Sequence, residues 1–226
     1  MIESLIIEFG FEQSIASESL HSLLTDLRTQ TAQIADGELS SLLYSGPETE
    51  YVPEELSPDT AIEHIVKHKK GFTQYQYENF FYSLQVNPTG DQPLAENNIY
   101  EERILINIDS VYFKSDYNVS ASDVVDLVSK ITSEVAPTVL IGYGIDIGPE
   151  NPLPELKWIT GPKNDQIPIH WLTYLPADLS GEGIFNEMHT QVHLNDHVLG
   201  TLTPSPTDIA DIRQKQQLLA DLLETA

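Results

Sequence analysis

Arg103-Ile-Leu-Ile-Asn-Ile-Asp109 has the regular alternation that decides the fold class. Ile104, Ile106 and Ile108 fall on one face of an extended chain, because successive side chains of a strand point to opposite sides. Their β-branched side chains suit a pleated, half-buried surface. We therefore predict a strand here, which Val111-Tyr-Phe113 would extend.

A helix and a second strand are predicted to follow. Ser120-Ala-Ser-Asp123 has the form of a capping box, in which the serine hydroxyl and the acid each bond a backbone N–H. Apolar residues continue at helical spacing to Val135, and Pro137 cannot extend that helix. Val139–Ile147 then alternates again. The connection is long enough for a crossover, so the two strands could lie parallel in one sheet.

The flanking segments predict further strands and helices. They comprise a strand at Leu5–Phe9, a helix capped by Ser14 or Ser17, one long strand or two strands within Phe72–Val86, an apolar strand at Ile169–Leu175, a hairpin turning at Asn195-Asp196, and a last helix from Thr207 or Asp208 to Glu224. The fold class that follows is α+β, with mixed or mainly antiparallel sheets and helices packed on one face. We expect a single domain, 1–226, with two similar packed halves, 1–98 and 99–226, as the alternative arrangement.

Charge is the outlying feature of the composition. The 226 residues include 35 acidic and 11 basic ones, a formal net charge of −24, and no cysteine. A charge of this sign disfavours nucleic acid and anionic membranes, and it favours a basic partner, a cation or a high-salt environment. The missing cysteines, the start without a basic, apolar leader, and the lack of a membrane-length apolar run together favour the cytoplasm.

Two groups of histidines have spacings that can suit a metal. His64 and His68 are four residues apart, as are His189, His193 and His197. The second group falls on the predicted hairpin, where helical spacing has no meaning, and the first lacks the glutamate position of a zinc-protease helix. We predict no metal site at either group.

No motif of a nucleotide-binding or catalytic site stands out. Gly142-Tyr-Gly144 follows a strand, but no helix follows to hold a pyrophosphate, so glycines that let a strand pass its neighbours explain it better. Glu101 and Glu102 are adjacent, and neighbouring strand residues point to opposite faces. We predict no catalytic residue and no cofactor.

The segment Glu48–Asp59 is rich in acids and contains no base. Two prolines stiffen it, and a tyrosine suits an interface core. It is predicted to be an exposed loop, with Asp59 or Thr60 capping a short helix that follows. The predicted partner-binding residues are Glu48, Glu50, Tyr51, Glu54, Glu55 and Asp59, and the alternative is a solvated connector.

Trp171-Leu-Thr-Tyr-Leu-Pro176 resembles the end of an apolar strand in bacterial immunity proteins of the immunity protein 52 family. Gly200-Thr-Leu is similar to a later strand of that family, and the closing amphipathic helix and the segment Leu5–Gly46 are similar as well. The resemblance implies an α+β protein without catalysis of its own, which binds and neutralises a cognate toxin.

Charge and resemblance together predict a non-enzymatic, cytoplasmic immunity protein whose partner is a basic protein toxin. Two alternatives remain open. One is an α/β enzyme whose site residues are dispersed along the chain, and the other is a salt-adapted acidic protein of different function.

Overall fold

The computed structural model describes residues 4–35, 38–78, 80–88, 100–109, 120–145, 157–160, 166–179 and 184–224. Contacts divide the chain into two compact units. The first comprises Met1–Ile7, Asp109–Ser133 and Val139–Ala226, and the second comprises Glu8–Ile108 and Glu134–Thr138. The strand β1, Ser4–Phe11, contributes residues to both units. The expected single domain, with its alternative halves 1–98 and 99–226, stays a prediction.

The second unit is built on an antiparallel sheet. Its strand order is β6-β5-β4-β2-β3, with β1 next to β6. The bounds are α1 Ser17–Ala35, β2 Leu39–Ser45, β3 Glu54–Glu55, α2 Pro58–His68, β4 Gly71–Tyr77, β5 Phe81–Val86 and β6 Glu102–Asp109, with a 3-10 turn at Pro47–Thr49. The predicted stretch Phe72–Val86 is therefore two strands of a hairpin, since the chain turns back between Tyr77 and Phe81.

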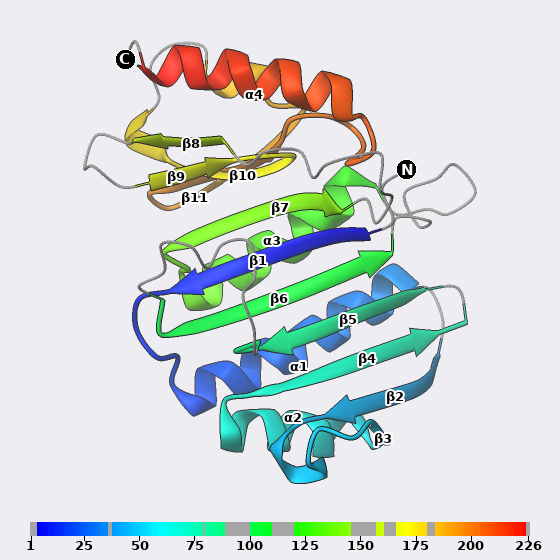
Figure 1. The fold of residues 1–226 in the computed structure, drawn as a ribbon. Helices are drawn as coiled ribbons and strands as arrows, with labels where there is room; N and C mark the ends of the chain where they lie inside the picture. Colours follow the sequence, from blue (N-terminus) through cyan, green and yellow to red (C-terminus); the bar gives the residue numbers. More distant parts are fainter. Residues whose placement is uncertain are drawn as a thin grey trace. The chain divides into compact units, whose positions relative to one another are not determined.

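Helices α1 and α2 both lie behind this sheet in the view of Figure 1. The strand residues that face them are buried, and aromatic rings make up much of this layer: Tyr75 and Tyr82 stack with their centroids 4.6 Å apart. Leu20, Leu23, Leu24 and Leu27 are the buried stripe of α1. One face of the sheet thus holds the apolar core of the unit.

The first unit combines a second antiparallel set of strands with two helices. Its strand order is β11-β12-β10-β7, with β1 next to β7, and β8 and β9 form a separate two-stranded sheet. The bounds are α3 Ala121–Val135, β7 Val139–Ile145, β8 Lys157–Thr160, β9 Gln166–Ile169, β10 Leu172–Pro176, β11 Thr190–Leu194, β12 His197–Thr201 and α4 Ile209–Glu224, with 3-10 turns at Ala177–Leu179 and Phe185–Glu187.

The α+β prediction is confirmed, and every pairing whose register is described is antiparallel. The central prediction also holds locally: β6 covers the isoleucine strand, β7 covers the later one, and each is a neighbour of β1 in the strand order. The proposed extension at Val111–Phe113 and the end of the second strand at Asp146-Ile147 lie outside the described residues.

The predicted capping box of α3 is confirmed. The Asp123 backbone N–H donates to Ser120 Oγ at 3.3 Å, and the Ser120 backbone N–H donates to Asp123 Oδ2 at 2.7 Å. The hairpin turning at Asn195-Asp196 is also confirmed, with Leu194 opposite His197. Asn195 has φ 48°, a left-handed conformation that asparagine tolerates better than most residues.

Two local predictions were wrong. The cap of α2 is Ser57, whose Oγ accepts from the Thr60 backbone N–H at 3.2 Å, because Pro58 occupies the first helical turn, which places the cap before the predicted Asp59 or Thr60. The predicted strand Ile169–Leu175 is broken at His170-Trp171 into β9 and β10. There the Trp171 backbone N–H donates to His170 Nδ1 at 2.7 Å, a bond that diverts the backbone from a ladder.

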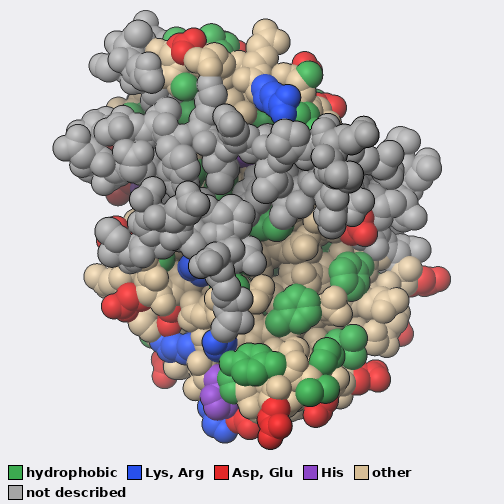
Figure 2. All heavy atoms as spheres, in the orientation of Figure 1, with side chains coloured by type: hydrophobic (Ala, Val, Ile, Leu, Met, Phe, Trp, Pro, Cys, Tyr) green, Lys and Arg blue, Asp and Glu red, His purple; other side chains and the backbone are tan. Residues whose placement is uncertain are grey.

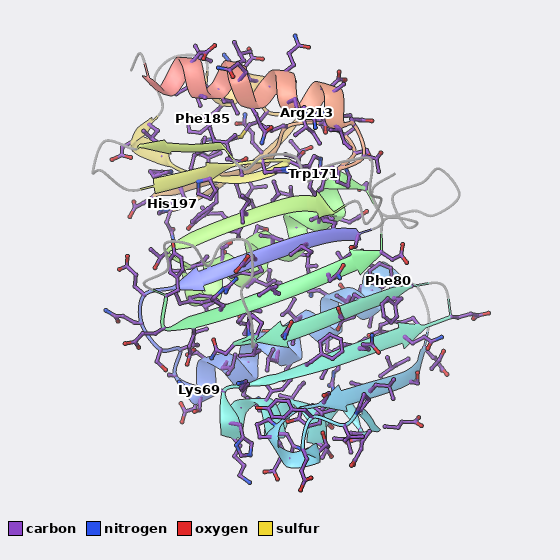
Figure 3. The ribbon with its side chains drawn as sticks, viewed as in Figure 1. Lys69, Phe80, Trp171, Phe185, His197 and Arg213 are labelled. Carbon is purple, nitrogen blue, oxygen red and sulfur yellow. The ribbon has the colours of Figure 1, made fainter. Side chains whose placement is uncertain are left out.

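Trp171 and Tyr174 are buried core aromatics. The indole Nε1–H of Trp171 donates to the Thr203 carbonyl at 3.0 Å, which ties β10 to the segment after β12 (Figure 3). Gly142 lies opposite Leu172, and a Cβ at this glycine would come within 2.6 Å of the Leu172 Cβ. The glycine therefore permits close strand passage, as the sequence suggested.

Candidate functional site: the Tyr51 patch

The acidic segment forms a tight turn at the outer edge of the second unit's sheet. The backbone N–H groups of Thr49 and Tyr51 both donate to the Gly46 carbonyl, at 3.1 and 2.9 Å, and the Val52 N–H donates to the Thr49 carbonyl at 2.9 Å. Glu50 and Tyr51 both adopt positive φ angles, 51° and 63°. Two successive non-glycine residues in this region cost conformational energy, so the surrounding contacts must hold the turn.

Glu48 supplies one of those contacts. Its Oε1 accepts a hydrogen bond from Lys67 Nζ and lies 2.8 Å from His68 Nε2, so it joins the turn to the end of α2. These hydrogen bonds lower the pKa of the Glu48 carboxyl to about 2. The segment itself contains no base, and the bases that bind Glu48 come from a helix that follows it in the chain.

Asp59 is neutralised in the same way. Its Oδ1 accepts from Arg28 Nη1 of α1 at 2.6 Å. In contrast, Glu50, Glu54 and Glu55 have no ion pair among the described residues. All five acids are exposed, so the sequence-predicted acids divide into two that are ion-paired and three that are not.

Apolar side chains are exposed beside these three acids. Tyr51 is 52% exposed and Val52 58%, and Leu43 of β2 is 37% exposed. They are three of the four large hydrophobic residues exposed in the described part of the chain; Leu218 is the fourth. Glu55 lies opposite Leu43, and Ser45 Oγ donates to the Tyr51 carbonyl at 3.0 Å, so the residues are contiguous.

We call this surface the Tyr51 patch, defined as Leu43, Glu50, Tyr51, Val52, Glu54 and Glu55. Lys70 Nζ lies 5.7 Å from the centroid of the Tyr51 ring, a cation–π contact that favours one ring position. Figure 2 shows hydrophobic and acidic side chains together in the region where Figure 1 draws β2, β3 and α2. Exposed apolar groups beside acids without an ion pair fit a protein surface of opposite charge better than they fit a catalytic site.

The histidines do not converge. His64 packs edge-on against the Tyr44 ring, 5.4 Å between centroids, while His68 binds Glu48. His197 is opposite Leu194 and shares its face of the hairpin, so His193, one residue earlier, points to the other face. His197 stacks on Tyr174 at 4.2 Å (Figure 3). Among the described residues no group of three or more potential ligands is placed to hold a metal ion.

Sequence reasoning missed two buried carboxylates in the second unit. Glu102 is 3% exposed and accepts from Ser14 Oγ at 2.7 Å and from the Ile15 N–H at 2.8 Å, with Lys69 Nζ 3.0 Å away. Glu8 is buried against Arg103, whose Nε donates to it at 2.6 Å. Burial raises the pKa of the Glu8 carboxyl, and Arg103 opposes that shift. The Glu102 bonds anchor the chain that enters α1, a structural role.

Comparison with known proteins identifies a solved structure of similar fold. No family model matches the chain, and no curated protein matches it. The structure is similar to that of the Pseudomonas aeruginosa T6SS protein PA0821, with a TM-score of 0.56 and 12% identity over 99% of this chain and 72% of that one. At this identity the likeness establishes a shared α+β fold. Among the described residues no helix is long and apolar enough to cross a membrane.

Proposed function

We propose that this chain is a non-enzymatic immunity protein that binds and neutralises a basic protein toxin, with the Tyr51 patch as part of its contact surface. The observation that carries the proposal is the exposure of Tyr51 and Val52 on a tied-down turn beside three solvent-facing acids. A partner would bury these apolar groups without first having to order the turn, which lowers the entropic cost of binding.

The similarity in fold to PA0821 supports the same proposal. PA0821 is described as a T6SS protein, and the two chains share their architecture across nearly the whole of this one. Membership of the immunity protein 52 family stays a prediction, as do the cytoplasmic location and the absence of catalysis. An acidic protein docked on a basic toxin would associate quickly and exclude the toxin's substrate.

The test is co-expression with the toxin that the neighbouring open reading frame is expected to encode. Induction of the toxin alone should stop growth, and co-expression of this chain should restore it. The purified proteins should form a complex whose rate of association falls as salt is added, because screening weakens attraction between opposite charges. Normal toxicity in the presence of the folded chain would refute the proposal.

A charge-reversed variant tests the patch itself. Glu50→Lys with Glu54→Lys should slow association at least about tenfold at low salt, since steering of this kind changes on-rates by about 10–1000-fold. The matched control, Asp126→Lys with Asp211→Lys, makes the same charge change at exposed positions of α3 and α4. Equal slowing by both variants would mean that net charge matters and the Tyr51 patch does not.

A further inference from the structure

Three strands of the second unit present an array of side chains without a single charge. The register places Leu43 of β2 opposite Gln74 of β4, which lies opposite Ser83 of β5. Opposed residues of an antiparallel sheet share a face, and so do residues two apart on one strand. We call the resulting array the neutral grid, and it consists of Ser41, Leu43, Ser45, Phe72, Gln74, Gln76, Phe81, Ser83 and Gln85.

This array lies on the side of the sheet away from α1 and α2. The intervening residues of the same strands, such as Tyr44, Tyr75 and Leu84, are buried on the helix side. In Figure 1 the two helices lie behind β4 and β5, and the viewer faces the neutral grid. Figure 2, in the same orientation, shows hydrophobic and other uncharged side chains in the lower centre of the molecule, with acidic side chains below and to the right, and basic and histidine side chains to the left.

The neutral grid is partly accessible to solvent. Gln76 is exposed and Leu43 is 37% exposed, while Phe72, Gln74 and Phe81 are of intermediate exposure. One residue in five of the chain is charged, and acids outnumber bases 35 to 11. Nine neutral positions in three adjacent rows are therefore a marked local departure from the rest of the surface.

Such a composition is typical of the centre of a protein interface. Interface centres are depleted in charge and enriched in aromatic residues, because a charge loses its hydration there without finding a partner. Polar amides such as Gln74 and Gln85 can still donate and accept hydrogen bonds across the contact. Glu55 of β3, which lies opposite Leu43 of β2 and therefore on the same face, would then form an acidic border at one edge of the neutral grid.

We propose that the neutral grid is the central docking surface for the toxin, and that the adjoining Tyr51 patch, which shares Leu43 with the grid, supplies its acidic border through Glu55. This inference rests on the proposed function and adds to it the chemistry of the partner. The partner surface is an uncharged, partly apolar area bordered by lysine or arginine. Charge complementarity at this border selects this occupant over a second copy of the chain, since two chains of formal charge −24 repel each other.

A negative and, in a separate variant, a positive charge at the centre of the neutral grid distinguish burial of this surface in the complex from simple electrostatic attraction. Gln74 is central, and we would compare Gln74→Glu with Gln74→Arg for binding to the purified toxin. If the array is buried in the complex, both variants should weaken binding at least about tenfold, because either charge would be desolvated without a partner. If the toxin were only attracted to acidic surface, Gln74→Glu would bind more tightly and Gln74→Arg less tightly.

Controls address charge and folding. Gln191→Glu and Gln191→Arg make the same changes at an exposed strand position of β11, and both should bind within about threefold of the wild type. Unchanged circular dichroism and thermal melting of the Gln74 variants would show that the sheet is intact. A generic basic protein such as lysozyme, used in place of the toxin, should not bind both Gln74 variants more weakly than it binds the wild type.

The possible failures are distinct. Toxin binding by both Gln74 variants at wild-type affinity would overturn the docking site while leaving the proposed function in place. Sedimentation showing a dimer that Gln74→Arg dissociates would assign the array to self-association and would also overturn the inference. A wild-type chain that forms no complex with the toxin would overturn both proposals.

Discussion

His170 is a buried residue whose protonation opposes folding. Its side chain is 1% exposed, and Nδ1 accepts the Trp171 backbone N–H at 2.7 Å, so the ring must be unprotonated at that atom. Burial lowers the pKa of His170 to about 4, and a hydrogen bond with the Gly142 backbone partly opposes that effect. His170 has no part in the functional surfaces proposed above. Its lowered pKa instead makes the stability of the fold depend on pH.

The first prediction is a loss of stability in mild acid that depends on His170. The unfolded state takes up a proton near pH 6.5, whereas the folded state does so only near pH 4. Stability contributed by the neutral ring is therefore full above pH 6.5, falls as pH decreases between these values, and is lost below them. At pH 5 the loss should be about 2 kcal/mol.

Urea unfolding from pH 7 to pH 4.5 measures this loss. His170→Asn, which can keep an acceptor for Trp171, should flatten the pH dependence by that amount, whereas His193→Asn, at an exposed histidine, should not. The same slope in His170→Asn and the wild type would show that other groups cause the acid sensitivity.

At the scale of elements, strand passage between β7 and β10 limits side-chain size. Gly142 lies opposite Leu172, and the leucine is fully buried. In an open strand, alanine is more stable than glycine by about 0.5–1 kcal/mol, because glycine loses more conformational freedom on folding. Here the approach of the opposing Cβ reverses that preference.

The second prediction is that Gly142→Ala destabilises the chain by about 1–3 kcal/mol, the range for overpacking a tight core. A double-mutant cycle with Leu172→Gly identifies the cause. Removal of the opposing Cβ should cost less in the alanine background than in the wild type, because the close contact is relieved there. Neutral or stabilising behaviour of Gly142→Ala in chemical denaturation would contradict the close approach.

At the scale of the molecule, the charge is large enough to affect folding as well as binding. Thirty-five acids against eleven bases repel one another in the compact state. Some acids are neutralised locally, as Glu48 is by Lys67 and Asp59 by Arg28. Most of the excess negative charge has no such partner to compensate it, because the bases are too few.

The third prediction is that added salt stabilises the chain. Raising the ionic strength from about 0.01 M to about 0.15 M shortens the screening length from about 30 Å to about 8 Å. A gain of about 1 kcal/mol would raise the melting temperature by about 2–4 °C in a chain of this size. Calorimetry in sodium and in potassium chloride should agree, since screening does not depend on the cation. A melting temperature that falls or stays constant would contradict net repulsion.

Local patterns were sufficient for much of the architecture. The alternation at Ile104, Ile106 and Ile108, the capping box of Ser120 with Asp123, and the turn at Asn195-Asp196 each involve residues close in sequence. Propensity, capping and turn chemistry act over a few residues, so these elements were predictable. The break at His170-Trp171 was not, because a side-chain-to-backbone bond replaced the ladder there.

The candidate site depended on the tertiary structure. The acidic composition of Glu48–Asp59 was visible in the sequence, but only the packing of α1 and α2 showed that Arg28 and Lys67 neutralise two of its acids. The alternate neutral residues of β2, β4 and β5 were likewise visible as separate short runs. Their union into one face follows from strand register, which joins residues far apart in the chain and is set by the burial of the opposite face against the helices.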